Sequence, residues 1–126
     1  WYTQAKGYGE VKLAVSVAGV DSFSDPLVVD EGDSVLGQVG LAATPNGGFL
    51  VSWMTFSEGT VGQLNLRYVD RDGVASSVFE AAKITKTGRA GLPQMVLFDN
   101  LAVTTWTGGG ETNKAVEVAT IQFDTL

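Results

Sequence analysis

Alternating apolar and polar positions predict β-strands along most of the chain. Residues 63–69 alternate between the two kinds, which is typical of a strand with one face in solvent. Residues 48–55 form a nearly continuous apolar run, which predicts a buried strand. Asn46-Gly47 precedes that run and predicts a type I′ hairpin turn, because both central residues of such a turn take positive φ. Residues 39–44 then supply the partner strand.

A turn and a further strand complete this unit. Asp70-Arg71-Asp72-Gly73 predicts a turn after the alternating strand, and residues 77–81 predict a short fourth strand. Residues 79–83 have some helical character, but they are too short for a helix and lack caps. The unit is therefore predicted to be a meander of four antiparallel strands.

The unit recurs with a period of about 50 residues, as repeat architectures do. Trp1, Trp53 and Trp106 are spaced by 52 and 53 residues, and residues 37–41 resemble residues 88–92 at an offset of 51. An alternating strand follows each tryptophan. These strands are expected at residues 10–15, 63–69 and 114–121.

Repeated four-stranded meanders of this length indicate the blades of a β-propeller. We expect an all-β fold in which antiparallel four-stranded meanders form about two and a half blades. Residues 1–30 are assigned to a half blade, residues 37–83 to a full blade, and residues 88–123 to a last blade with three strands. A ring takes about four to eight blades. The expected partners are therefore the remaining blades of a longer protein, or other copies of the chain.

Composition restricts the chemistry that such a fold can carry. The chain has 126 residues, enough for one domain, and a formal net charge of −6. It contains no histidine and no cysteine, which excludes imidazole and thiolate catalysis, disulfides and metal sites built on these ligands. The acidic balance argues against nucleic-acid binding, and no apolar run is long enough to span a bilayer. We expect no cofactor, no metal, no nucleic acid and no membrane partner.

An ordered set of short segments resembles the sialidase-like (BNR, or Asp-box) six-bladed propellers of bacterial secreted proteins. The set covers nearly the whole chain and looks like the C-terminal part of such a propeller. Its members are Trp1–Thr3, Lys12–Ser16, Ser22–Val29, Gly37, Val51–Trp53, Leu66–Asp70, Asp72–Gly73, Arg89–Pro93 and Thr105–Thr107. Residues 16–23 look like a worn Asp-box, which keeps Ser16 and ends in the aromatic Phe23 but has Ala18 where the aspartate belongs.

The resemblance implies where a ligand would be bound. Sialidases use a tyrosine nucleophile paired with a glutamate, an aspartate acid/base, and three arginines that hold the substrate carboxylate. The comparable inner-strand openings of this chain have no tyrosine, and Arg67 and Arg71 are expected on an outer strand and its turn. Arg89 stands at an opening that faces the central pocket, with Gln38 at the equivalent position. We therefore expect no catalytic residue here, and Arg89 and Gln38 as ligand-binding residues; the alternative for Arg89 is a hydrogen bond to a backbone carbonyl or an ion pair with a surface aspartate.

Other residues with chemical potential have structural explanations. Trp53 and Trp106 are interpreted as packing between blades, with sugar stacking as the alternative. Tyr2 and Tyr8 flank a glycine-rich hairpin, and no pattern places a carboxylate beside either. Residues 70–73 faintly resemble a calcium loop, but the later ligands are missing, which favours a plain turn.

Two functions from different classes follow. In the first, the chain is the C-terminal segment of a sialidase-like propeller that in full length binds or hydrolyses a glycan, and this segment mainly completes the ring. In the alternative, the chain is a non-catalytic lectin that closes a propeller ring from several copies. A third possibility is a purely structural propeller that presents a partner-binding face. The protein is expected to be secreted or periplasmic in a bacterium. Because the chain opens at Trp1, within an expected strand, we expect a removed leader or a piece of a longer protein.

Overall fold

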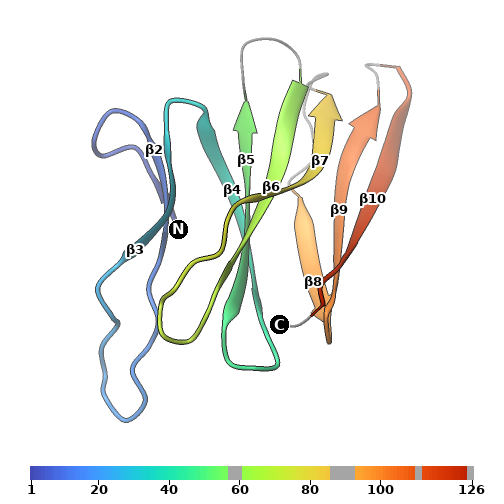
Figure 1. Cartoon of the computed structure of the whole chain (residues 1–126). Helices are drawn as coiled ribbons and strands as arrows, with labels where there is room; N and C mark the ends of the chain where they lie inside the picture. The colour runs from blue at the N-terminus through green and yellow to red at the C-terminus, as the bar shows by residue number, and fades with distance from the viewer. Residues whose placement is uncertain (57–60, 86–92, 110–111, 125–126) are drawn as a thin grey trace.

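The computed structural model describes residues 1–56, 61–85, 93–109 and 112–124, which form three antiparallel sheets (Figure 1). The first sheet contains β1 (Tyr2–Thr3), β2 (Gly9–Leu13) and β3 (Leu27–Gly32). The middle sheet contains β4 (Val35–Ala43), β5 (Phe49–Phe56), β6 (Val61–Val69) and β7 (Phe79–Thr85). The third sheet contains β8 (Gln94–Phe98), β9 (Leu101–Gly109) and β10 (Lys114–Gln122). The prediction of an all-β chain made of antiparallel sheets is confirmed, and the propeller arrangement stays a prediction.

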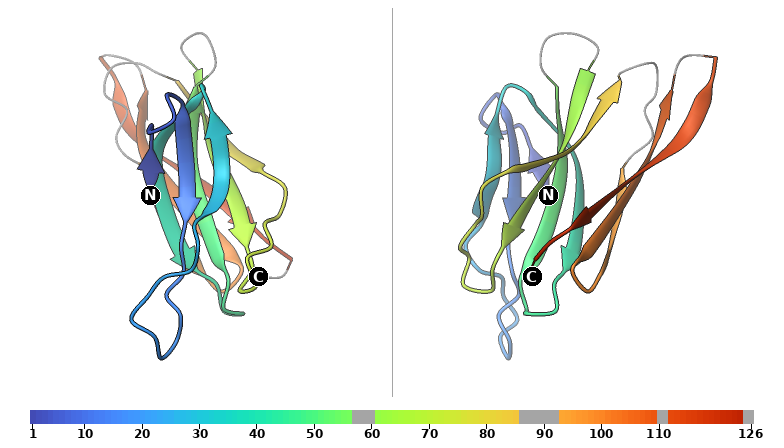
Figure 2. Two further views of the ribbon diagram at one scale, coloured as in Figure 1. Left: turned by 90° about the vertical axis from the view of Figure 1, so that its left-hand side faces the viewer. Right: turned by 45° about the vertical axis from the view of Figure 1, so that its right-hand side comes forward.

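The middle sheet is covered on both faces, so the three sheets form a stack (Figures 1 and 2). One face packs on the first sheet through the buried residues Val11, Leu13, Val29, Val35, Val51, Trp53 and Val69. The other face packs on the third sheet through two clusters, Leu50, Leu66, Ala102 and Ile121, and Met54, Leu64, Ile84 and Trp106. Successive side chains of β5 therefore enter opposite cores, which explains the nearly continuous apolar run of this strand.

Two tryptophans mark the same face of successive sheets. Trp53 in β5 is fully buried against the first sheet, where its Nε1 donates a 2.7 Å hydrogen bond to Asp30 Oδ2 in β3. Trp106 in β9 packs against the middle sheet, and its Nε1 donates a 2.7 Å hydrogen bond to Glu117 Oε2 in β10. Each indole thus faces the preceding sheet. The structure places both tryptophans between sheets and not on a sugar-stacking surface.

The turn between β4 and β5 differs from the predicted type. The Thr44 N–H donates to Gly48 O, and the Gly47 N–H donates to Thr44 O, so the hairpin is present. Gly47 has a φ of 85°, but Asn46 does not adopt a positive φ, and the turn is therefore not type I′. The Thr44 hydroxyl accepts from the Gly48 N–H at 3.0 Å and donates to Asn46 Oδ1 at 2.6 Å. These local bonds stabilise the wider loop.

Candidate functional site

Gln38 lies in a distorted part of β4. The pairing of β4 with β5 shifts between Val35 and Gly37 and again between Gly37 and Gly40. Gly37 and Gln38 have φ values of 80° and 53°, in the left-handed region that residues other than glycine rarely adopt. A Cβ on Gly37 would lie 2.7 Å from Cγ of Tyr2, so glycine allows the ring to pack on this backbone. Backbone strain of this kind is concentrated at functional sites, which supports a role for Gln38.

The side-chain oxygen of Gln38 is an unsatisfied acceptor. Within the described part of the chain, Oε1 is buried and has no hydrogen-bond partner. Strand β4 is an edge of the middle sheet, and it contacts β2 of the first sheet and β8 of the third. A buried carbonyl without a donor costs about 1–3 kcal/mol. A donor that reaches Oε1 after a rotation of the Gln38 side chain would remove this cost.

The other sequence-predicted ligand residue, Arg89, lies outside the described residues. Its position relative to Gln38 therefore stays a prediction. Arg67 lies in β6, and its guanidinium donates hydrogen bonds to the carbonyl oxygens of Val29 and Ser76. This arginine thus joins the first sheet to the middle sheet, where β6 is paired with β5 on one side and with β7 on the other; its expected place on an outer strand of a propeller stays a prediction.

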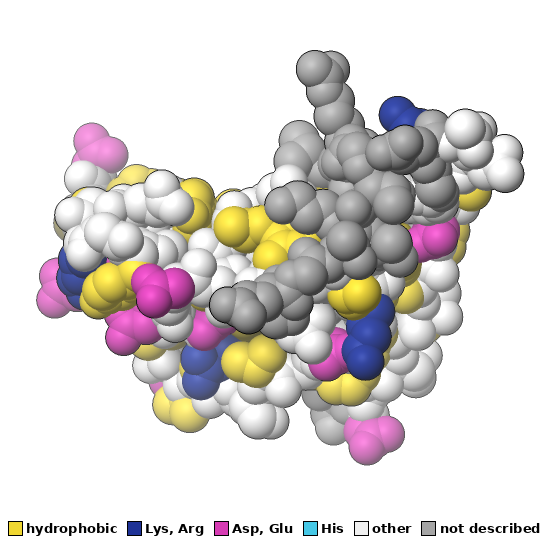
Figure 3. Space-filling view, turned by 90° about the horizontal axis from the view of Figure 1, so that it is seen from above, with side chains coloured by type: hydrophobic (Ala, Val, Ile, Leu, Met, Phe, Trp, Pro, Cys, Tyr) yellow, Lys and Arg dark blue, Asp and Glu magenta, His cyan; other side chains and the backbone are white. Residues whose placement is uncertain are grey.

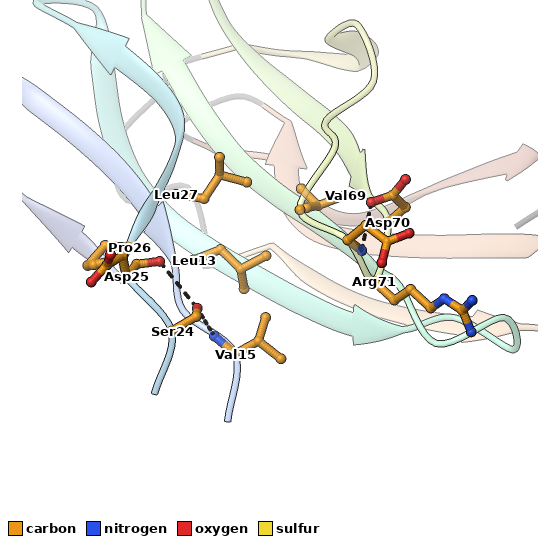
Figure 4. A pocket seen from close by; sticks show the side chains of 11 residues that line it. Leu13, Val15, Ser24, Asp25, Pro26, Leu27, Val69, Asp70 and Arg71 are labelled. Carbon is orange, nitrogen blue, oxygen red and sulfur yellow. Dashed lines mark hydrogen bonds between the residues drawn. The ribbon is translucent and has the colours of Figure 1, made fainter. Parts of the chain in front are cut away.

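A cleft of about 370 Å³ lies between the β2–β3 loop and the β6–β7 turn (Figure 4). Its apolar lining comes from Leu13, Val15, Pro26, Leu27 and Val69, and its polar lining from Ser24, Asp25, Asp70, Arg71 and Asp72. The first-sheet residues form the opposite side of the cleft, and the Arg71 side chain points away from them (Figure 4). The volume is within the range of sites for small molecules, but the cleft does not include Gln38.

The same hydrogen-bond motif, here named the serine clip, occurs in the β2–β3 loop, which lines the cleft, and in the β6–β7 connection next to the cleft residues Val69–Gly73. In each case, a serine hydroxyl accepts from a backbone N–H across the hairpin and donates to the carbonyl of the residue that follows the serine. Ser24 accepts from the Val15 N–H at 3.0 Å, and Ser76 accepts from the Tyr68 N–H at 3.1 Å. The two serines are 52 residues apart, as are the first two tryptophans. Sequence analysis missed the clips, although this shared spacing was a usable signal.

Asp70 stabilises its own turn. Its Oδ1 accepts hydrogen bonds from the Asp72 N–H at 2.9 Å and the Val74 N–H at 2.8 Å, and Gly73 takes a φ of 84°. The interpretation of residues 70–73 as a plain turn therefore fits the structure. Across the described ranges, no group of three or more acidic side chains is arranged to hold a metal ion.

Tyr8 has a carboxylate neighbour, which corrects the sequence-based expectation. Its hydroxyl donates to Glu31 Oε2 at 3.4 Å; Glu31 is exposed and Tyr8 is half-buried. The pairing of β2 with β3 sets Glu10 opposite Glu31, and this register brings the Tyr8 ring within reach. The pattern of the sequence did not indicate this pairing because the loop between the two strands is long. A long, exposed contact of this kind is typical of a surface hydrogen bond.

Charged side chains of the first sheet are paired locally. Glu10 has a side chain that is 1% exposed, and its carboxylate oxygens lie 2.9 Å from Lys6 Nζ and 3.4 Å from Lys12 Nζ. The hydrogen-bonding Lys6 ammonium holds the pKa of the Glu10 carboxyl below its ordinary value, and Glu10 in turn raises the pKa of Lys6. At the upper end of the stack, seen from above in Figure 3, basic side chains are dispersed among acidic ones.

No family model, curated protein or solved structure matches the chain. Among the described residues, the structure contains no helix with the length and apolar character needed to cross a membrane. The candidate site is therefore defined by geometry, and its centre is the strained edge of β4 with the free acceptor of Gln38.

Proposed function

We propose that the chain is a segment of a sialidase-like propeller that in full length binds or hydrolyses a glycan, and that this segment mainly completes the ring. The observation that best supports the proposal is the direction of stacking. Trp53 and Trp106 both face the preceding sheet, so each sheet repeats the contact made by the one before it. Sheets that repeat one contact in one direction build a ring or a superhelix.

In this proposal, β4 and β8 are inner strands that surround a central pocket. The two strands are edges of adjacent sheets and contact each other. Gln38 would contribute to the wall of the pocket, and its Oε1, which is closed to solvent in this arrangement, would accept a hydrogen bond from a sugar hydroxyl after the side chain turns toward the pocket. Arg89 would hold a carboxylate of the glycan, because a guanidinium fork matches a carboxylate in bidentate geometry.

The segment itself is proposed to be non-catalytic. Arg67 is held by two backbone carbonyls, and the Tyr2 hydroxyl donates to Val35 O at 3.2 Å. Both side chains are therefore occupied by contacts that stabilise the fold. Hydrolysis by the full-length protein would depend on residues of other blades. As a member of this class, the protein would be secreted or periplasmic in a bacterium.

Titration of the purified 126-residue chain with 3′-sialyllactose, followed by calorimetry, tests the proposal. We expect Gln38→Ala to weaken binding about five-fold, the effect of losing one hydrogen bond of about 1 kcal/mol. Gln122→Ala removes an exposed amide on β10 and is the matched control, which we expect to bind like the wild type.

Equal affinity of the Gln38→Ala and Gln122→Ala variants would contradict the role of Gln38. If the chain does not bind 3′-sialyllactose at all, the proposal that it contributes to a glycan-binding pocket is wrong. The same preparation is expected not to hydrolyse a fluorogenic sialoside. Turnover that is lost in Arg89→Ala would show instead that this segment is catalytic.

A further inference from the structure

The two internal interfaces of the stack use the same pair of faces. The tryptophan-bearing face of the middle sheet packs on the first sheet, against Val11 and Val29. The tryptophan-bearing face of the third sheet packs on the other face of the middle sheet, against Met54 and Leu64. In both cases a tryptophan-bearing face covers an aliphatic face of the preceding sheet.

The first sheet carries a tryptophan-bearing face that nothing in the described structure covers. Trp1 is 51% exposed, and it lines a cavity of about 400 Å³ together with Ala14, Phe23, Ser24 and Pro26. The N–H of Lys12 donates to Trp1 O, and the Trp1 ammonium donates to Lys12 O, so Trp1 pairs with Lys12 at the end of the β1–β2 ladder. We name the surface made by Trp1, Ala14, Phe23, Pro26 and Val28 the Trp1 face. Lys12 pairs with Trp1 and with Val28, so its side chain lies on the same face, where its ammonium is 3.4 Å from the Glu10 carboxylate.

The third sheet carries the complementary kind of face. Ala102 and Ile121 point toward the middle sheet, so alternate residues of the strands point away from it. We name this surface the Val118 face; its residues are Val96, Phe98, Leu101, Val103, Val116 and Val118. Phe98 and Val116 are 64% and 75% exposed, and the outward residues between Val116 and Gln122 are uncharged.

We propose that the Trp1 face of one copy of the chain docks on the Val118 face of a second copy. The contact is of the same kind as the two interfaces of the middle sheet, in which a tryptophan-bearing face packs on an aliphatic face. Every copy of the chain has both faces. Because the two faces differ, the association is head-to-tail and continues until it closes or forms a filament. In one long propeller the same two faces would meet the neighbouring blades, whereas in this proposal a second copy of the chain takes their place. The docking does not depend on glycan binding, and its test measures assembly and not sugar affinity.

The ends of the two faces match when sheets are stacked in one orientation. Phe23 and Pro26 belong to the β2–β3 loop, and Phe98 precedes the β8–β9 turn. Both loops lie at the lower end of the stack in Figure 1. A second copy that continues the stack therefore brings the most exposed aromatic residues of the two faces, Phe23 and Phe98, to the same end of the interface. Burial of these rings is the main gain in the contact.

Two matched variants, each blocking one face, test the docking. Phe23→Glu blocks the Trp1 face and Phe98→Glu blocks the Val118 face; the side chains are 72% and 64% exposed, so the fold of each copy is expected to persist. Val74→Glu, at a 65% exposed position in the β6–β7 turn, adds the same charge outside both faces and is the control. Circular dichroism checks the fold, and light scattering measures the mass.

We expect the wild type and Val74→Glu to associate with rising concentration, and each blocked variant alone to have the 13.2 kDa mass of one chain. An equimolar mixture of the two blocked variants retains one good Trp1 face and one good Val118 face, so it should form a dimer and nothing larger. A wild type that stays monomeric at millimolar concentration would overturn the proposal. So would a blocked variant that assembles alone, or a mixture that fails to pair.

Discussion

The indole N–H of Trp53 depends on one acceptor from another sheet. Asp30 Oδ2 accepts this hydrogen bond at 2.7 Å, and the Trp53 side chain is fully buried. We expect Asp30→Ala to lower the free energy of unfolding by about 1–3 kcal/mol, because it leaves a buried donor unpaired. Urea denaturation followed by tryptophan fluorescence measures the change. Asp21→Ala, at an exposed loop position, is the control and should cost less than about 0.5 kcal/mol; equal losses would contradict the structural role of Asp30.

Glu10 makes the free energy of unfolding depend on pH in the acidic range. Because Lys6 lowers the pKa of Glu10 in the folded chain, Glu10 contributes stability that is present above its ordinary pKa of 4.5. This contribution is lost as the pH falls below 4.5 and through the lower folded pKa. We expect Glu10→Gln to remove that part of the acid dependence, as measured by urea unfolding at pH 7, 4.5 and 3. Asp21→Asn is the control. If the free energy of unfolding of the Glu10→Gln variant depends on pH as it does in the wild type, the Lys6–Glu10 pair is not the source of the acid dependence.

The sequence predicts the chemistry of a site only where the types of residue alone decide which reactions or ligands are possible. The absence of histidine and cysteine restricts the chemistry in any fold. The unsatisfied oxygen of Gln38 could not be predicted, because it results from two successive left-handed residues and a shifted register. The position of Gln38 in the repeat predicts a ligand contact, whereas the strain at that position is a property of the backbone that the repeat does not indicate.

The serine clips act at the scale of a strand pair, because each joins the two strands of a hairpin. The Ser76 hydroxyl accepts a hydrogen bond from the Tyr68 N–H at 3.1 Å. We expect Ser76→Ala to cost about 1 kcal/mol and to speed hydrogen exchange at the Tyr68 amide. Ser77→Ala changes the next exposed serine and is the control. Exchange that is equally fast in both variants would show that the clip does not hold the hairpin.

Strands could be predicted from the period of their apolar residues, whereas their ends could not. The fourth strand of the middle sheet was expected at residues 77–81 and is observed at Phe79–Thr85. Ser76 and Ser77 are engaged in the clip, so the ladder begins later than their pattern predicts. At the other end, Ile84 enters the core between the middle and third sheets and extends the strand. Side-chain hydrogen bonds, which are absent from a hydropathy pattern, decided the first boundary, and packing against another sheet decided the second.

At the scale of the whole molecule, the repeat could be predicted because three tryptophans recur at nearly constant spacing. Their common orientation, and the arrangement of three sheets in one stack, required the structure. The candidate pocket remains defined by Gln38 alone, because Arg89 lies outside the described residues. The propeller and its glycan are thus proposals that rest on a repeated contact and on one free acceptor.

The burial of both faces of the middle sheet has a consequence for how the molecule unfolds. The sheets interact with their neighbours in the stack, so the free energy of unfolding is approximately a sum of sheet and interface terms, as in a one-dimensional chain of coupled units. The third sheet can then open while the interface between the first and middle sheets persists. Amide protons of β5 would exchange last, and a substitution in β3 would leave the protection of β9 unchanged.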